Sequence, residues 1–472
     1  MATVRAADPG LAARARATLA EIAPDLISGT RWSGLGGRPV RDLRVVDAFG
    51  FEDGGLLVVI DVTAEGTSPP ARLTLPAVDA PPWRGLHELA RNGESVVGIE
   101  GGYLRGDPPT PGGPRTGPAA TPTRAIRPVP GDQSHTSLII DESVVLKLYR
   151  RISEPPSPEP EVLSALARFA SQLDAPVPAW RGAVTLELAD GFTTTIAIQQ
   201  AFVPDAADAF EWLADGLAGS LADGAKEFGY ELVSAAGHAT GRLHRALASI
   251  PEPPFQTRPG TPEDRHGWLQ AASLAADAAV DTVASLEPAL AEQLARARPA
   301  IDKALAPLGD SRRTVQLQRI HGDLHLGQIL PAPDGVLFID FEGDPTRQPA
   351  ERIAAQAPVR DVAAFLRSID HVARSARRRA VARGFASPPT GSDDARMERW
   401  IAAARAAFLD HYAAGLGDRA WRVDEPLLRA FEVKKELAEF VYAARFLPPW
   451  LYAPIGGLRA LLGAAFDAPA GP

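Results

Sequence analysis

Runs of apolar, mostly β-branched residues dominate the chain before Pro204 and predict strands. These runs end at or near glycine, proline or an acidic turn, and they lie at residues 55–66, 71–79, 95–106, 135–150 and 183–203. The last two are long enough to fold back as hairpins, with turns at Asp141-Glu142 and Asp190-Gly191. Between them, apolar positions at helical spacing predict a helix over residues 160–173.

The pattern changes after Pro204. From there to the C-terminus alanine and leucine recur at helical spacing, for example over residues 209–223 and 399–412. The exception is region 328–342, where two short apolar strands flank the turn-forming segment PAPDG. Residues 1–24 also have a helical composition. The pattern therefore predicts an α+β fold, with strands concentrated before Pro204 and helices after it.

These elements divide the chain into three predicted parts. We expect a β-rich N-terminal cap subdomain at 1–90, a small mixed lobe at 91–203 and a large, mainly helical lobe at 204–472. Segment 107–133 is rich in proline, glycine and threonine, and we expect it to be a long exposed loop or linker.

Composition and charge narrow the class of protein. The chain is 45% hydrophobic and 23% charged, as ordinary globular proteins are, and it has no cysteine for disulfides or thiolate metal sites. Its net charge of -9 argues against a nucleic-acid partner, and the basic run at 373–384 is expected to be a solvated helix face. No apolar run approaches the ~20 residues of a membrane span, and the N-terminus lacks a signal-peptide core. We therefore expect a cytoplasmic protein with no membrane partner.

The segment HGDLHLGQIL, residues 321–330, concentrates polar side chains of two kinds. His321 and His325 are four residues apart, a spacing that places two zinc ligands on one face of a helix. However, Gly322 stands where a zinc protease of the HExxH type has its glutamate, and the segment runs at once into a predicted strand. A zinc site is therefore the weaker interpretation.

Phosphoryl transfer explains more of this segment. Such a site needs one carboxylate to orient the attacking hydroxyl, and a second carboxylate with a neutral oxygen to hold Mg²⁺ against nucleotide phosphates. Asp323 fits the first role. Gln328, five residues later, and Asp340, at the end of the apolar strand VLFID, fit the others. An aspartate after a strand often only caps a turn, but three such residues in this order favour the kinase interpretation.

Candidates for a nucleotide site precede these residues. Lys147 lies within the predicted strand VVLKLY, where a lysine that binds ATP phosphates is expected, and Glu161 in the next helix can pair with it. Alone, such a lysine is usually a snorkelling edge residue, and such a glutamate usually favours a helix start. The other candidates are a hydroxyl-rich loop over the phosphates, Gln133, Ser134, Thr136 and Ser137, and a linking segment beside the adenine, Gln200, Phe202 and Val203.

HGDLHLGQ followed by VLFIDFEGDP resembles the catalytic and metal-binding motifs of the aminoglycoside phosphotransferase and sugar kinase group. More closely, the chain resembles actinobacterial maltokinases and their glucosamine kinase relatives. The likeness extends over nearly the whole chain, including residues 351–370 and 431–450 and, weakly, residues 29–39. It implies a bilobal protein-kinase-like fold with an N-terminal cap, ATP and Mg²⁺ as cofactors, and a sugar as the small-molecule substrate.

The resemblance also implies a role for each matching position. Asp323 would be the catalytic base, with His325 supporting its loop. Glu342 would touch a second metal or a metal-bound water. The remaining roles agree with those argued above: Lys147 and Glu161 at the ATP phosphates, and Gln328 and Asp340 at Mg²⁺.

The acceptor is predicted from the C-terminal helix, because the resemblance implies that this helix lies at the sugar pocket. Maltokinases typically carry Tyr-Glu-x-x-Asn-Arg-Pro-x-Trp there, and in this chain Ala443, Phe446 and Leu447 replace the glutamate, asparagine and arginine, which puts maltose in doubt. At ~100° per residue, three carboxylates share one helix face and would suit a cationic amino sugar. The alternative is a solvated acidic stripe with Lys435 paired to its neighbour. The predicted acceptor residues on this helix and just after it are Glu432, Glu436, Glu439, Tyr442 and Trp450.

The expected function is ATP- and Mg²⁺-dependent phosphorylation of glucosamine, giving glucosamine 6-phosphate. The alternatives are a maltokinase giving maltose 1-phosphate, an aminoglycoside phosphotransferase and a pseudokinase-like binding module. The intact set of Lys147, Asp323, Gln328 and Asp340 argues against a pure binding module. The sequence does not decide between a monomer and a homodimer.

Overall fold

The structure, a computed structural model, falls into two compact units. It describes residues 9–21, 24–30, 33–109, 125–129, 135–223, 228–345, 347–384, 391–418 and 421–467. The first unit comprises Met1–Ala170, Pro178–Pro204 and Pro345–Ile353, and the second comprises Ser171–Val177, Asp205–Asp344 and Ala354–Pro472. The chain therefore passes repeatedly between the two units, and neither is one continuous segment.

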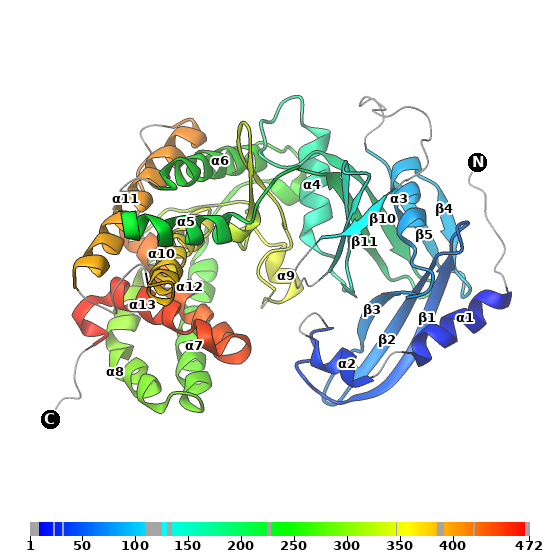
Figure 1. The fold of residues 1–472 in the computed structure, drawn as a ribbon, viewed down its shortest axis with the longest axis horizontal. Coiled ribbons are helices and arrows are strands. Elements are labelled where there is room, and N and C mark those ends of the chain that lie inside the picture. The colour runs from blue at the N-terminus through cyan, green and yellow to red at the C-terminus, as the bar shows by residue number, and fades with distance from the viewer. Residues whose placement is uncertain are drawn as a thin grey trace. The chain divides into compact units, whose positions relative to one another are not determined.

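Within the described residues, the first unit holds a four-stranded sheet in the order β1-β2-β3-β9 and a seven-stranded sheet in the order β4-β5-β10-β11-β8-β7-β6 (Figure 1). The strands are β1 (Val40–Gly50), β2 (Leu56–Ala64), β3 (Ala71–Pro76), β4 (Ser95–Val97), β5 (Tyr103–Asp107), β6 (Ile126–Pro128), β7 (Thr136–Ile140), β8 (Val144–Leu148), β9 (Arg151–Ile152), β10 (Trp180–Glu187) and β11 (Thr193–Ala201). The helices are α1 (Pro9–Ala20), α2 (Pro24–Gly29), α3 (Trp83–Asn92), α4 (Pro158–Arg168) and α9 (Pro349–Arg352).

The four-stranded sheet is built around β2. Its sequence LLVVIDVTA is an almost unbroken apolar run, and nearly every residue of the strand is buried. A continuous run rather than an alternating one suits a strand that is covered on both faces. On one face, Val58 and Ile60 share a core with Leu11 and Ala15 of α1.

The seven-stranded sheet carries the candidate nucleotide lysine. All of its neighbouring strands pair antiparallel, with β10 and β11 at its centre, and α3 packs against β5 and β10. In this register Lys147 of β8 stands between Ser137 of β7 and Ile198 of β11. Helix α4 follows, capped by Ser157, whose hydroxyl accepts from the Glu159 N–H.

The second unit is mainly helical. Its helices are α5 (Ala209–Asp223), α6 (Tyr230–Ala248), α7 (Pro262–Ala284), α8 (Pro288–Leu305), α10 (Val359–Ala382), α11 (Gly391–Leu416), α12 (Glu425–Phe446) and α13 (Tyr452–Leu462). Its strands form two short antiparallel pairs, β12 (Arg258–Pro259) with β13 (Gln316–Leu317) and β14 (Ile329–Ala332) with β15 (Gly335–Phe338).

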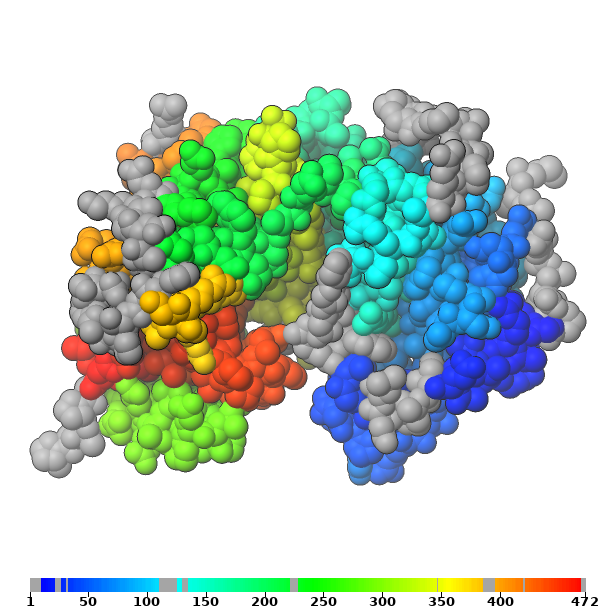
Figure 2. Space-filling model, viewed as in Figure 1, coloured from blue at the N-terminus to red at the C-terminus, as the bar shows by residue number. Residues whose placement is uncertain are grey.

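Helix α10 is the centre of the second unit. Most of its first five turns are buried, and it packs against α5, α11, α12 and α13 (Figure 1). On the outer surface, the light green α8 lies beside the red C-terminal segment (Figure 2). There the Gln293 amide donates to the Phe466 carbonyl and the Asp467 carboxylate.

Most of the predicted elements are confirmed. The hairpins β7–β8 and β10–β11 turn at the predicted residues, and β14–β15 is the predicted strand pair within the helical region. The helix predicted at 160–173 begins earlier, at Pro158, and ends at Arg168. Strand β1 and helix α3 were not predicted. In β1 two irregularities in register interrupt the alternation on which a strand prediction depends.

Two further predictions concern exposed or membrane segments. Most of the predicted linker, at 110–124 and 130–133, lies outside the described residues, while β6 within the same segment pairs with β7. Among the helices that the structure describes, none is both long enough and apolar enough to cross a membrane.

Candidate active site

The loop from His321 to Gln328 is held by its backbone. The N–H groups of His321 and Gly322 donate to the two carboxylate oxygens of Asp361, at 2.8 and 2.9 Å. Gly322 has a φ of +89°, and a Cβ at this position would meet the Gly343 Cα at 3.2 Å. Glycine is therefore needed immediately before Asp323, both for the backbone conformation and for the close approach.

Asp361 is the buried anchor of this loop. Its carboxylate also accepts from Nε2 of His244 at 3.1 Å, and Nδ1 of that imidazole lies 2.9 Å from the Tyr412 hydroxyl. Burial by itself would raise the pKa of Asp361, but the hydrogen bond from His244 and the other donors around it hold the pKa below its usual value. An ionised carboxylate thus ties the loop to α10. Asp361 was not predicted as a site residue, although it stands in an Arg-Asp-Val-Ala pattern that resembles the family.

Both histidines of the segment contact the backbone. His321 is buried, with Nε2 2.9 Å from the Ile339 carbonyl oxygen, and Nδ1 of His325 accepts from the Gly327 N–H at 3.0 Å. Burial lowers the pKa of His325, which favours the neutral ring that this contact requires. Among the described residues, no cluster of three potential metal-ligating side chains includes either histidine. The geometry thus gives the histidines a framing role in the loop.

Gln328 and Asp340 meet across the base of the β14–β15 hairpin. The Gln328 amide lies 3.1 Å from Oδ2 of Asp340, and the Ile339 N–H donates to the Gln328 carbonyl at 3.0 Å. Asp340 adopts a left-handed φ of +66°, uncommon for a residue with a side chain and often found at functional sites. Glu342 follows two residues later and is half-buried. Carboxylate and amide oxygens are ligands that suit Mg²⁺, so this donor set fits the predicted metal.

Asp323 itself contacts a lysine from α12. Nζ of Lys435 lies 3.2 Å from Oδ1 of Asp323 and 2.9 Å from Oε1 of Glu439. Burial opposes the charge on Lys435, but the neighbouring carboxylates, led by Glu439, outweigh it and raise the pKa of the ammonium. Glu439 is thus paired with Lys435. This pairing was expected if the three glutamates were not an acceptor site but an acidic helix face.

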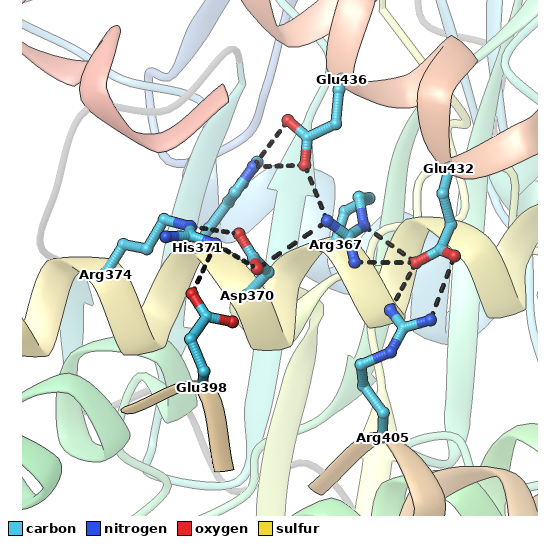
Figure 3. Close-up of polar contacts among 8 residues, drawn as sticks. All are labelled: Arg367, Asp370, His371, Arg374, Glu398, Arg405, Glu432 and Glu436. Carbon is cyan, nitrogen blue, oxygen red and sulfur yellow. Dashed lines mark hydrogen bonds and ion pairs between the residues drawn. The ribbon is translucent and has the colours of Figure 1, made fainter. Parts of the chain in front are cut away.

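The other two glutamates of the predicted acceptor face require a correction. Glu432 and Glu436 are buried within a network of charges that joins α12 to α10 and α11 (Figure 3). Glu432 accepts from Arg367 at 2.9 Å and from Arg405 at 3.1 Å, while Glu436 accepts from Arg367 at 3.3 Å and faces Nε2 of His371 at 3.0 Å. Their carboxylates are engaged by these cations, so they form no free stripe for a cationic sugar.

The first unit contains Lys147, the lysine predicted to bind the ATP phosphates. Nζ of Lys147 donates to Oε2 of Glu159 at 2.7 Å, and the Tyr149 hydroxyl donates to the same oxygen at 2.7 Å. All three residues are buried. The predicted orienting residue, Glu161, is therefore replaced by Glu159. Two residues along a helix is a rotation of ~200°, so the two glutamates point in nearly opposite directions.

The other predicted nucleotide residues are only partly described. Gln133 and Ser134 lie outside the described residues. Thr136 accepts from Arg150 at 3.0 Å, and Ser137 is buried beside Lys147 in the sheet.

The segment predicted to lie beside the adenine ends β11. The Phe202 N–H donates to the Ser143 carbonyl at 2.9 Å, so this backbone group is already used. Gln200 is half-buried next to it, and Val203 follows. The structure places these residues in one short stretch, and their part in binding adenine stays a prediction.

The two predicted aromatic residues lie in the last turns of α12, for Tyr442, and in the turn that follows it, for Trp450. Trp450 packs between Phe210, His371 and Tyr452, with ring centroids 5.3 to 6.2 Å apart. Tyr442 packs on Phe446, whose side chain is about half exposed. A role for Tyr442 and Trp450 in binding the acceptor remains a prediction.

The second unit thus holds a tethered loop aspartate and a carboxylate and amide pair across a hairpin, and the first unit holds a buried lysine with its glutamate. Residues 125–400 match the phosphotransferase enzyme family, and the chain belongs to this family. This assignment confirms the predicted enzyme class, a phosphotransferase that uses an alcohol group as acceptor.

Within this family the chain is similar to glucosamine kinases. One, from Streptacidiphilus jiangxiensis, is 34% identical over 351 residues, which are 73% of this chain and 75% of that protein. Another, from Mycolicibacterium smegmatis, is 31% identical over 348 residues, 73% of this chain and 81% of the relative. A solved structure of a glucosamine kinase in complex with glucosamine, ADP and inorganic phosphate matches with a TM-score of 0.67 at 27% identity, over 93% of this chain and 99% of that one. This match confirms the predicted α+β, kinase-like fold.

Proposed function

We propose that the protein is an ATP- and Mg²⁺-dependent kinase that phosphorylates glucosamine to glucosamine 6-phosphate. The observation that carries this proposal is the Asp323 loop, whose backbone is tied to Asp361 while about a fifth of the Asp323 side chain stays exposed. A carboxylate mounted in this way can orient an acceptor hydroxyl and accept its proton during phosphoryl transfer. The similarity to glucosamine kinases supports the choice of acceptor.

Two other sets of residues would serve the nucleotide. Gln328 and Asp340 would hold Mg²⁺, with Glu342 beside them, and Lys147 would bind the phosphates from the orientation set by Glu159. When bound, the metal neutralises phosphate charge and so favours attack by the hydroxyl. A binding module without chemistry would not need the full set of Lys147, Asp323, Gln328 and Asp340.

The carboxylates near Asp323 suit a cationic acceptor. Asp323 and Glu439 both contact Lys435, and Asp344 is near enough to help raise the pKa of that lysine. Carboxylates would attract an ammonium-bearing sugar more than glucose or maltose. The proposal favours the 6-hydroxyl because it is the primary, least hindered hydroxyl of the sugar.

An acceptor screen with ATP and Mg²⁺ tests the function directly. The panel contains glucosamine, glucose, maltose, N-acetylglucosamine and an aminoglycoside. Proton–phosphorus correlation NMR of the product then identifies the hydroxyl that carries the phosphate. We expect the highest kcat/KM for glucosamine. Turnover of maltose without glucosamine would instead make the protein a maltokinase, and preference for the aminoglycoside would make it an antibiotic phosphotransferase. Nucleotide binding with no turnover of any acceptor would favour the binding module.

Two variants test the assigned roles. Asp323→Asn removes the proton acceptor but keeps the shape of the side chain, and we expect kcat to fall about 10²–10⁴-fold with nucleotide affinity unchanged. Asp340→Asn is expected to weaken binding of ADP in the presence of Mg²⁺ while leaving metal-free ADP binding intact, as measured by calorimetry. Near-full activity of Asp323→Asn would overturn the assignment of the base.

A further inference from the structure

Lys435 is the one lysine that reaches Asp323 within the described residues. Its ammonium lies 3.2 Å from Oδ1 of Asp323, and no described residue donates a hydrogen bond to Oδ2 of that carboxylate. The Lys435 side chain is three-quarters buried, and the two carboxylates that it contacts are about four-fifths buried. The contact is thus shielded from solvent, unlike the exposed ion pairs that contribute little to stability.

The ammonium is held in place from its own helix. Glu439, one turn further along α12, contacts Lys435 at 2.9 Å, which restricts the otherwise flexible side chain. The charges of Glu439 and Asp323 also keep the lysine protonated despite its burial. Lys435 is therefore a fixed cation rather than a mobile one.

Helix α10 sets the position of both partners. One set of its side chains holds the catalytic loop, because Asp361 accepts from the loop N–H groups and the Ser368 hydroxyl accepts from the Leu326 N–H at 3.0 Å. Another set, Arg367 and His371, holds α12 through the buried glutamates (Figure 3). The loop that carries Asp323 and the helix that carries Lys435 are thus fixed to the same element.

We propose that Lys435 is a positioning residue for phosphoryl transfer, holding Oδ1 of Asp323 so that Oδ2 is presented to the acceptor hydroxyl. This inference rests on the proposed function. In a loose phosphoryl-transfer transition state the base chiefly orients the hydroxyl, so a carboxylate of fixed rotamer is more useful than a strongly basic one. Lys435 would then affect the rate of the bound complex rather than the affinity for the sugar.

The test compares Lys435→Met with wild type on the acceptor that wild type prefers. We expect kcat to fall about 10- to 100-fold, the loss typical of one charge-assisted hydrogen bond, with the KM for the acceptor changed less than about threefold. Lys435→Arg should recover part of kcat. Lys303→Met, which removes an exposed lysine of α8, is the matched control and should behave as wild type.

Chemical rescue separates positioning from folding. In Lys435→Ala, added ethylammonium should raise kcat in a saturable way, while Asp323→Asn should not respond to it. A Lys435→Met enzyme with wild-type kcat, or a rise in the KM for the acceptor without loss of kcat, would overturn the inference and leave the proposed function standing. If wild type phosphorylates no acceptor in the panel, the proposed function fails and the inference falls with it.

Discussion

Two glutamates in the first turn of α4 differ sharply in their surroundings. Glu159 is buried and accepts from both Lys147 and Tyr149, whereas Glu161, two residues on, lies on another side of the helix and is half-buried. The sequence prediction named Glu161, but both glutamates stand in the first turn, so position along the chain does not separate them. The tertiary contact between Lys147 on β8 and the start of α4 determines that Glu159 is the partner of the lysine.

This difference predicts unequal effects of one conservative change. Glu159→Gln should raise the KM for ATP and lower kcat/KM about 10- to 100-fold, because the lysine loses its charged partner. Glu161→Gln is the matched control and should stay within about threefold of wild type. Steady-state kinetics with varied ATP provide the measurement, and equal losses in the two variants would contradict the assignment.

Asp361 is the second residue on which the site depends, although it touches no substrate. Asp361→Asn replaces one acceptor oxygen by a donor, which leaves a buried loop N–H without its partner. Such a group costs about 1–3 kcal/mol. We expect the free energy of unfolding in urea to fall by this amount and kcat to fall while the KM for ATP changes little. Unchanged kcat in a destabilised Asp361→Asn protein would show that the anchor serves folding alone.

At the scale of elements, α12 is fixed to its neighbours by buried charges. Arg367 lies between Glu432 and Glu436, and Arg405 and His371 complete the contacts on either side (Figure 3). Removing one member of a buried ion pair leaves its partner uncompensated. The network therefore makes α12 sensitive to single changes that would be harmless at the surface.

We expect Glu432→Gln to lower the free energy of unfolding by about 3–5 kcal/mol, because Arg367 and Arg405 would share a neutral partner. The control is Glu398→Gln, at the exposed edge of the same network, where the loss should stay below about 1 kcal/mol. Urea unfolding monitored by circular dichroism gives both values. Similar losses in the two variants would show that burial does not govern the network.

The same network predicts a pH dependence of stability. Burial lowers the pKa of His371, but the charge and hydrogen bonds of Glu436 outweigh it and raise the pKa above its usual value. A raised pKa in the folded state contributes stability that is complete below the unfolded pKa of about 6.5 and is lost as pH rises through the folded value.

Thermal unfolding measured from pH 6 to 9 tests this expectation. His371→Gln should remove the part of the decline in Tm with rising pH that this histidine contributes, while His266→Gln, an exposed histidine of α7, should leave the profile unchanged. A His371→Gln profile parallel to wild type would contradict the assignment.

At the scale of the whole molecule, the discontinuous first unit determines which fragments can fold. Strands β10 and β11 lie at the centre of its seven-stranded sheet, yet they belong to Pro178–Pro204, beyond a short segment of the second unit. A fragment of residues 1–177 would lack both central strands, and the remaining strands would have no common partner. A fragment of residues 1–204 retains the complete sheet.

We expect the 1–204 fragment to be soluble and to unfold cooperatively in urea, and the 1–177 fragment to be unfolded or aggregated. Far-ultraviolet circular dichroism and urea titration of both fragments provide the comparison. Cooperative unfolding of residues 1–177 would show that the central strands are dispensable to this unit.

The sequence by itself determined the class of chemistry and most of the elements. Hairpins with acidic or glycine turns, the apolar run of β2 and the order of Lys147, Asp323, Gln328 and Asp340 are local or ordered along the chain, so pattern and spacing suffice to predict them. The family assignment confirms the enzyme class that this order indicated.

The tertiary structure decided which charges are available. Glu432, Glu436 and Glu439 share a face on a helical wheel, but α10 and α11 supply the cations that neutralise the first two, and Lys435 pairs with the third. The choice of Glu159 over Glu161 and the anchoring of the loop by Asp361 are decided in the same way. A charge is neutralised by whatever lies within a few ångströms of it, and across packed helices those neighbours come from distant parts of the sequence, which no local pattern records.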